Sequence, residues 1–229
     1  MTILENDLLE VNIDNKGAEM QRLYHKQFRL DYLWNGNPDF WGKHSPVLFP
    51  IVGTLENNTY YYNGKEYQLT RHGFARNREF KLEQSDKTTA AFLLSSDAVT
   101  KVIYPFDFSL HVHYTLQDNT LEVKYIIENT AKDPMYFSIG GHPAFRVPLV
   151  EKTNYEDYYL LFDRKETLDR LLLVNNLIDT KQESFLKEEN KIPLRHELFY
   201  QDAIVLKNPR SAFITLKSDK VNHGINFHF

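Results

Sequence analysis

The stretch LHVHYTLQDNTLEVKY, residues 110–125, alternates apolar and polar side chains on both sides of a short polar turn. Every second residue is apolar in 110–116, and the same holds in 121–125. Because successive side chains of a strand point to opposite faces, each run predicts a strand with one buried and one solvated face. The polar turn at 117–120 predicts that the two strands form an antiparallel hairpin.

A second hairpin is predicted around Asn63-Gly64, which follows a run of tyrosines and accepts the positive φ angles of a type I′ turn. Short runs separated by turn residues favour an antiparallel β-sandwich over alternating strands and helices. Leu168–Ile178 fits a helix or a buried strand with its turn, and the charged stretch Glu183–Lys191 is expected to be a solvated loop. The other expected strands are Leu8–Asp14, Ala18–Tyr24, Phe28–Trp34, Arg78–Gln84, Ala90–Leu94, Met135–Ile139, Tyr158–Phe162, Ile204–Leu206 and Ala212–Lys217.

Composition limits the classes of protein to consider. The 229 residues, 42% of them hydrophobic, suffice for one domain with a full core, expected over residues 1–229. With 27 basic against 31 acidic residues, the chain is not expected to bind nucleic acid or an anionic membrane. The absence of cysteine excludes disulfides, thiolate metal sites and cysteine nucleophiles. No signal peptide or apolar span is apparent, so a cytoplasmic protein is expected.

Histidines, carboxylates and arginines are the main candidates for chemistry, because glycine-rich phosphate loops and the serine-hydrolase elbow are absent. His111 and His113 lie on one face of a predicted strand and are interpreted as polar residues of its wetter face, with no metal proposed. A denser group is RHGFAR at 71–76, and GGHPAF at 140–145 presents a second histidine after a Gly-Gly break. Each histidine alone is more often structural, but together they can serve one small ligand as acid and hydrogen-bond donor.

These motifs resemble the aldose 1-epimerase (galactose mutarotase-like) superfamily, and its LacX-like branch in particular. The resemblance covers the chain from about residue 10 to its end and also shows some likeness to the hexose-6-phosphate epimerases. The matching pieces occur in the family's order: SPVLFPIVG at 45–53, the Asn63-Gly64 hairpin, RHGFAR at 71–76, GGHPAF at 140–145 and DAIV at 202–205.

The resemblance implies a large twisted β-sandwich, or supersandwich, that binds a small-molecule aldose and needs no cofactor. It implies interconversion of the α and β anomers of a free hexose by acid and base catalysis. His142 matches the general acid toward the ring oxygen, and His72 matches a hydrogen-bond donor to the ring oxygen and nearby hydroxyls. Asp202 matches an acceptor for sugar hydroxyls. Arg76 matches an arginine near the substrate of the sugar-phosphate enzymes.

Apolar and cationic groups complete the expected site. Trp41 and Phe145 are candidates for a wall against the C–H face of the sugar. Arg71, together with Arg76, is a candidate for anion recognition, because guanidinium suits phosphate. This keeps a hexose-6-phosphate 1-epimerase as an alternative, and Thr54, where many family members have arginine, counts against it.

The family's catalytic base is a glutamate on a strand well after the aspartate motif, and no glutamate follows Glu197 in this chain. The chain is therefore expected to be a C-terminally truncated member of the family. A second alternative follows from the same observation, namely a carbohydrate-binding β-sandwich without turnover.

Overall fold

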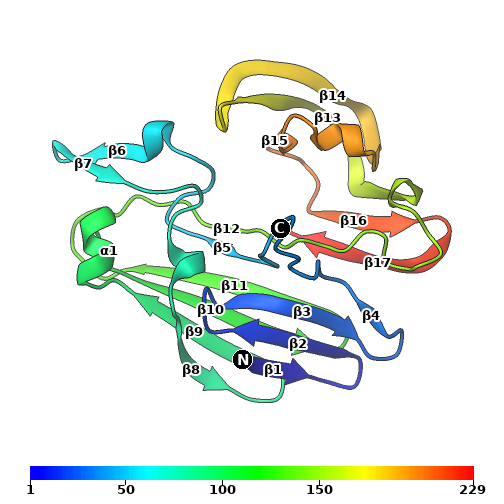
Figure 1. Ribbon diagram of the computed structural model, residues 1–229, viewed down its shortest axis with the longest axis horizontal. Coiled ribbons are helices and arrows are strands. Elements are labelled where there is room, and N and C mark those ends of the chain that lie inside the picture. Colours follow the sequence, from blue (N-terminus) through cyan, green and yellow to red (C-terminus); the bar gives the residue numbers. More distant parts are fainter. The chain divides into compact units, whose positions relative to one another are not determined.

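A computed structural model describes residues 1–229 and consists mainly of antiparallel strands (Figure 1). The expected all-β fold is confirmed, and helices are few and short. Contacts within the chain divide it into two compact units, Met1–Arg146 and Val147–Phe229, each of which is described by itself.

The first unit begins with a four-stranded antiparallel sheet whose strands follow chain order. Burial alternates strictly along β2, where Leu9, Val11 and Ile13 face the core. The expected strand Phe28–Trp34 is reduced to two paired residues in β4. The strands of this sheet are β1 (Thr2–Glu5), β2 (Leu9–Asp14), β3 (Glu19–His25) and β4 (Leu30–Asp31).

A second sheet of the first unit contains the hairpin predicted from residues 110–125, with Gln117 paired to Thr120 at its end. The alternating pattern places Leu110, Val112 and Tyr114 in the core. The Tyr114 hydroxyl donates to the Ala18 carbonyl at 2.7 Å, which links this sheet to the first one. The strand order is β11-β10-β9-β8, comprising β8 (Lys81–Ser85), β9 (Thr89–Ser95), β10 (Phe108–Gln117) and β11 (Thr120–Asn129).

The opposite face of β10 is polar, as the alternation predicts. The rings of His111 and His113 lie 6.0 Å apart between centroids. Strands β8 and β11 supply carboxylates to His111, with Nδ1 3.2 Å from Glu83 and Nε2 3.6 Å from Glu128.

The first unit also contains two separate two-stranded ladders. The hairpin of β6 (Thr59–Tyr62) and β7 (Lys65–Gln68) turns at Asn63-Gly64, whose φ angles are 49° and 74°, as predicted. The other ladder joins β5 (Val47–Leu48) to β12 (Gly140–Gly141).

The expected strand Met135–Ile139 is wrong, since only Gly140 and Gly141 pair with β5. Prolines bound this ladder at both ends. The Ser138 amide donates to the Pro50 carbonyl at 2.8 Å, and the His142 amide donates to the Pro46 carbonyl at 3.1 Å. An antiparallel ladder needs N–H donors from both strands, and Pro46 and Pro50 have none. The ladder therefore stops after two residues.

The second unit has the strand order β14-β13-β16-β17, with β15 also paired to β13. Phe162, Leu186 and Ile192 form its small core. Its strands are β13 (Tyr158–Val174), β14 (Leu177–Pro193), β15 (Val205–Leu206), β16 (Phe213–Ser218) and β17 (Val221–His228).

The long β13–β14 hairpin contains two stretches whose structure was predicted from sequence, Leu168–Ile178 and Glu183–Lys191. Leu168–Ile178 forms strand ends and a turn at Asn175-Asn176, whose φ angles are 53° and 64°. The loop expected at Glu183–Lys191 is wrong, because this stretch belongs to β14. Its charged side chains are mostly exposed, and Glu183 pairs across the hairpin with Arg170 at 2.7 Å. These charges stay solvated or paired, so they are compatible with a strand.

Helical segments are minor. The six-residue helix α1 (Ala98–Ile103) is capped by Asp97, whose side chain accepts from the Thr100 amide. None of the helices combines the length and apolarity needed to cross a membrane. The remaining helical turns are η1 (Glu56–Asn58), η2 (Ala75–Asn77), η3 (Tyr155–Asp157) and η4 (His196–Phe199).

Candidate active site

His142 follows directly on the β5–β12 ladder. Its amide is fixed by the Pro46 carbonyl, and the Ala144 amide donates to the His44 carbonyl at 2.8 Å. Gly141 leaves room for a neighbour, because a Cβ there would lie 2.9 Å from the Tyr125 hydroxyl. The backbone on both sides of His142 is thus held, while the residue itself is exposed.

His72 lies in a tight loop and has a φ of 69°, in the left-handed region. The loop packs closely on the buried Phe49, since a Cβ at Gly73 would be 2.2 Å from the Phe49 carbonyl oxygen. The Gly53 amide donates to Nδ1 of His72 at 3.0 Å, and the His72 amide donates to the Gly53 carbonyl at 2.8 Å. Both the backbone and the ring of His72 are therefore held in place.

These two segments bring the histidines together, as the motifs predicted. The ring centroids of His72 and His142 are 5.8 Å apart, with the planes at 69°. Trp41 also contacts His142, with centroids 5.1 Å apart. The Trp34 indole donates to the Trp41 carbonyl at 2.8 Å, which holds the loop that carries this ring. Three of the predicted site residues thus form one cluster of rings.

The environment of His72 keeps its imidazole neutral. Burial lowers its pKa to about 4, and the nearby charges of Arg76, Arg71 and His142 act in the same direction. Because Nδ1 accepts a hydrogen bond from Gly53, the proton of the neutral ring is on Nε2. His72 can therefore donate one hydrogen bond from Nε2 to a ligand at neutral pH.

The two arginines bracket the His72 loop. One guanidinium nitrogen of Arg76 donates to the Arg71 carbonyl at 2.7 Å. Burial, followed by the Arg71 charge, lowers the pKa of Arg76. Arg71 is exposed, whereas Arg76 is partly buried. Arg76 thus has a structural contact within the loop in addition to any role toward a ligand.

Sequence reasoning missed Glu19, a buried carboxylate that organises the same region. Its Oε1 accepts from the amides of His44 at 2.7 Å and Ser45 at 3.2 Å. Its Oε2 accepts from Lys43 Nζ at 3.1 Å, and Lys43 also donates to the Arg76 carbonyl. A charge between Ala18 and Met20 on a predicted strand was the available signal, because buried carboxylates need partners.

Phe145 and Asp202 are the remaining predicted residues. Phe145 is partly buried and forms an isolated bridge with Leu33. Asp202 belongs to the second unit, in an exposed turn where its Oδ1 accepts from the Ala203 amide at 2.8 Å. The Thr54 hydroxyl oxygen is buried without a hydrogen-bond partner. No group of three or more histidine and carboxylate side chains is arranged to hold a metal ion.

Comparison with known proteins agrees with this fold. The aldose 1-epimerase family profile matches residues 1–224. The plasmid-encoded protein LacX of Lactococcus lactis subsp. lactis is 35% identical over 240 residues, which cover 100% of this chain and 80% of that protein. The chain therefore belongs to the aldose 1-epimerase family, and its similarity to LacX is consistent with the LacX-like branch.

Two solved structures are similar over nearly the whole chain. A galactose mutarotase related enzyme from Lactobacillus acidophilus has a TM-score of 0.93 and 36% identity, covering 98% of this chain and 75% of its own. A galactose mutarotase-like protein from Lactobacillus casei has a TM-score of 0.93 and 31% identity, covering 100% of this chain and 79% of its own. The predicted galactose mutarotase-like β-sandwich is thus confirmed.

Proposed function

We propose that this chain interconverts the α and β anomers of a free hexose. The single observation that carries the proposal is the pair of imidazoles, 5.8 Å apart, in a chain of the aldose 1-epimerase family. His72 is a neutral hydrogen-bond donor, and His142 is exposed beside the indole ring of Trp41. A pyranose offers such a pair its ring oxygen and hydroxyls, and it offers the indole its C–H face.

In the proposed reaction His142 donates its proton to the ring oxygen while a base takes the proton of the anomeric hydroxyl. The bond between C1 and the ring oxygen breaks, and the electron pair of the hydroxyl forms the aldehyde carbonyl. Rotation about the C1–C2 bond and closure on the other carbonyl face give the second anomer, with both proton transfers reversed. Acid and base act together because neither a free alkoxide nor a protonated ether is stable at neutral pH.

The other residues have supporting roles in this proposal. His72 donates from Nε2 to the ring oxygen and a neighbouring hydroxyl, and Trp41 covers the apolar face of the sugar. Phe145 extends that wall. Arg76 lies near the substrate. The base is not assigned to a residue of this chain, and the reaction uses proton transfers between side chains and sugar alone.

A free sugar is favoured over a sugar phosphate by two features. The Arg76 guanidinium donates to the Arg71 carbonyl, which occupies part of its donor set. Thr54 replaces an arginine that many family members have at this position, so the chain has one cation fewer for a phosphate.

The test is anomer exchange followed by polarimetry or NMR with freshly dissolved α-glucose and α-galactose. We expect the protein to raise the exchange rate above that of buffer. Binding of sugar without acceleration would support the carbohydrate-binding alternative instead. Tighter binding of glucose 6-phosphate than of glucose would favour the phosphosugar alternative.

A further inference from the structure

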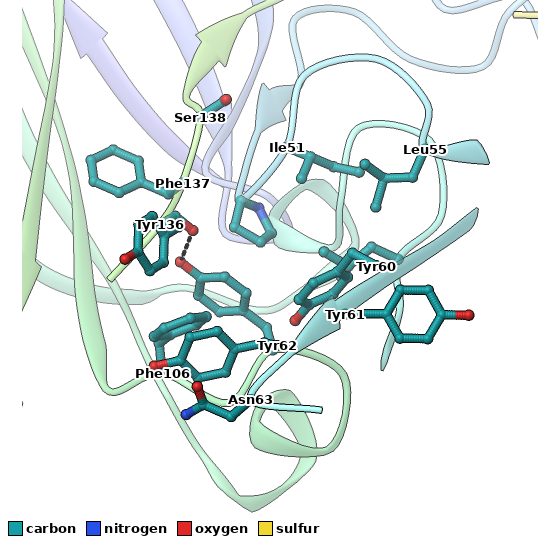
Figure 2. A pocket seen from close by; sticks show the side chains of 13 residues that line it. Ile51, Leu55, Tyr60, Tyr61, Tyr62, Asn63, Phe106, Tyr136, Phe137 and Ser138 are labelled. Atoms are coloured by element: carbon teal, nitrogen blue, oxygen red, sulfur yellow. Dashed lines mark hydrogen bonds between the residues drawn. The ribbon is translucent and has the colours of Figure 1, made fainter. Parts of the chain in front are cut away.

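An open pocket of about 560 Å3 lies in the first unit (Figure 2), and its lining does not include His72, His142 or Trp41. Tyrosine and phenylalanine supply seven of its thirteen lining residues, and none of the thirteen is charged. In Figure 2, Tyr60 and Tyr61 lie on one side of the view, and Tyr136 and Phe137 lie on the other. The pocket thus offers aromatic faces to a neutral ligand.

Hydrogen bonds and ring contacts hold several of these rings. The Tyr104 hydroxyl donates to the Tyr136 carbonyl at 2.9 Å, and the Tyr60 hydroxyl donates to the Ile103 carbonyl at 2.9 Å. Tyr62 packs on Phe106 with centroids 4.7 Å apart. The pocket wall is therefore formed before any ligand binds, which reduces the entropic cost of binding.

Two further wall residues are exposed, and their rings are available to a ligand. Tyr61 is 71% exposed and Tyr136 is 67% exposed. Asn63 and Ser138 add an amide and a hydroxyl to the lining. Aromatic faces together with a few neutral hydrogen-bonding groups suit a pyranose, which has C–H faces and a rim of hydroxyls.

The pocket and the histidines share the β5–β12 segments. The Pro46 carbonyl accepts from His142 at one end, and the Pro50 carbonyl accepts from Ser138, which lines the pocket, at the other. Three residues separate Ser138 from His142, so their Cα atoms lie at most ~14 Å apart. A Cβ at Gly140 would lie 3.2 Å from a Val52 methyl, so glycine lets the two segments approach closely.

We propose that this pocket is a second sugar subsite, which binds the non-reducing ring of a reducing disaccharide whose reducing ring lies at His72 and His142. The assignment rests on the proposed function for the position of the reducing ring. The uncharged lining favours a neutral ring over a phosphorylated one, because none of the lining residues offers a phosphate a cationic partner.

The experiment compares binding of glucose, maltose, cellobiose and lactose by calorimetry and saturation-transfer NMR. The test variant is Tyr61→Ala/Tyr136→Ala, and the matched control is Tyr200→Ala, which removes a tyrosine 78% exposed in the second unit. We expect at least one disaccharide to bind about 5-fold to 10-fold more tightly than glucose, the gain typical of aromatic contacts. The double variant should bind glucose with the wild-type Kd but should bind the disaccharide no more tightly than glucose. The Tyr200→Ala control should keep the tighter binding of the disaccharide.

The proposal is overturned if no disaccharide binds the wild-type protein more tightly than glucose, or if the double variant keeps the advantage. Urea unfolding of each variant confirms that it is folded. Anomer exchange on glucose without any disaccharide advantage leaves the proposed activity standing and rejects the subsite. A disaccharide advantage that depends on the tyrosines, without anomer exchange, supports the subsite and rejects the activity.

Discussion

Gly53 and His72 exchange hydrogen bonds: the Gly53 amide donates to Nδ1 of His72 at 3.0 Å, and the His72 amide donates to the Gly53 carbonyl at 2.8 Å. The first bond assigns the proton of the neutral imidazole to Nε2. The second holds the backbone of His72 in the left-handed region. A main-chain contact thus determines both the tautomer and the direction of the ring, which a carboxylate partner does in many other sites.

The first prediction concerns pH. Burial, Arg76 and Arg71 lower the pKa of His72 from 6.5 to about 4 in the folded chain. An unfolded chain therefore takes up this proton first as the pH falls, and the contribution of His72 to stability is lost between about pH 6.5 and about pH 4. Urea unfolding at a series of pH values should show the wild-type protein losing more stability over this window than His72→Asn.

Asparagine is the appropriate replacement because it tolerates a positive φ, so the loop of residue 72 is retained. A direct readout is the NMR chemical shift of the His72 ring, assigned by its absence in the variant. The shift should stay that of neutral imidazole down to about pH 5, one unit above its pKa. Half-protonation near pH 6.5 would contradict the described environment.

The second prediction concerns the proposed acid. His142→Asn keeps a polar side chain but cannot donate a proton to the ring oxygen, so the catalysed anomer exchange of glucose should fall about 100-fold or more. The Kd for glucose should change far less, since the residue is exposed and one of several groups at the site. Equal losses in rate and in binding would reject the acid role.

The third prediction concerns Glu19. Glu19→Ala leaves Lys43 and the amides of His44 and Ser45 without their acceptor, and it should lower the free energy of unfolding by about 3–5 kcal/mol. The control Glu5→Ala removes an exposed partner of Lys26 and should have a much smaller effect in urea unfolding. Similar decreases in the free energy of unfolding for Glu19→Ala and Glu5→Ala would show that the buried contacts of Glu19 do not stabilise the fold.

The fourth prediction separates backbone strain from close packing. Gly64 and Gly73 have φ angles of 74° and 70°, but only Gly73 lies where a Cβ would meet the Phe49 carbonyl, at 2.2 Å. Gly64→Ala should cost about 1 kcal/mol of stability from strain alone. Gly73→Ala should cost about 1–3 kcal/mol more, because the loop must move away from Phe49. Equal decreases in the free energy of unfolding for the two variants, measured in urea, would mean that the loop around Gly73 moves away from Phe49 without loss of stability.

Local patterns predicted much of the fold. The alternation in residues 110–125 and the Asn63-Gly64 pair determine hairpins through neighbouring residues alone, and both hairpins are present. Met135–Ile139 failed as a strand because its neighbour is the proline-bounded segment 46–50, which the local sequence of the strand does not reveal. The charge of Glu183–Lys191 predicts a loop, but the stretch belongs to β14, because a strand tolerates charged side chains that are solvated.

The candidate site was predictable where residues lie within motifs. His72, His142 and Trp41 were singled out by glycine and proline neighbours and by the family resemblance, and the structure brings them together. Glu19 was missed because its partners at 43–45 are distant in sequence. The role of Asp202 and the expectation of one sugar-binding domain remain predictions.

The turn at Asn175-Asn176 has a practical consequence for handling this protein. It closes the longest hairpin of the chain, and both residues are exposed. Exposed loop tips of this kind accept inserted sequences better than any other part of a fold. A fluorescent label or affinity epitope placed there would interrupt the second unit only at the tip of this hairpin. His72, His142 and the aromatic pocket of Figure 2 all belong to the first unit.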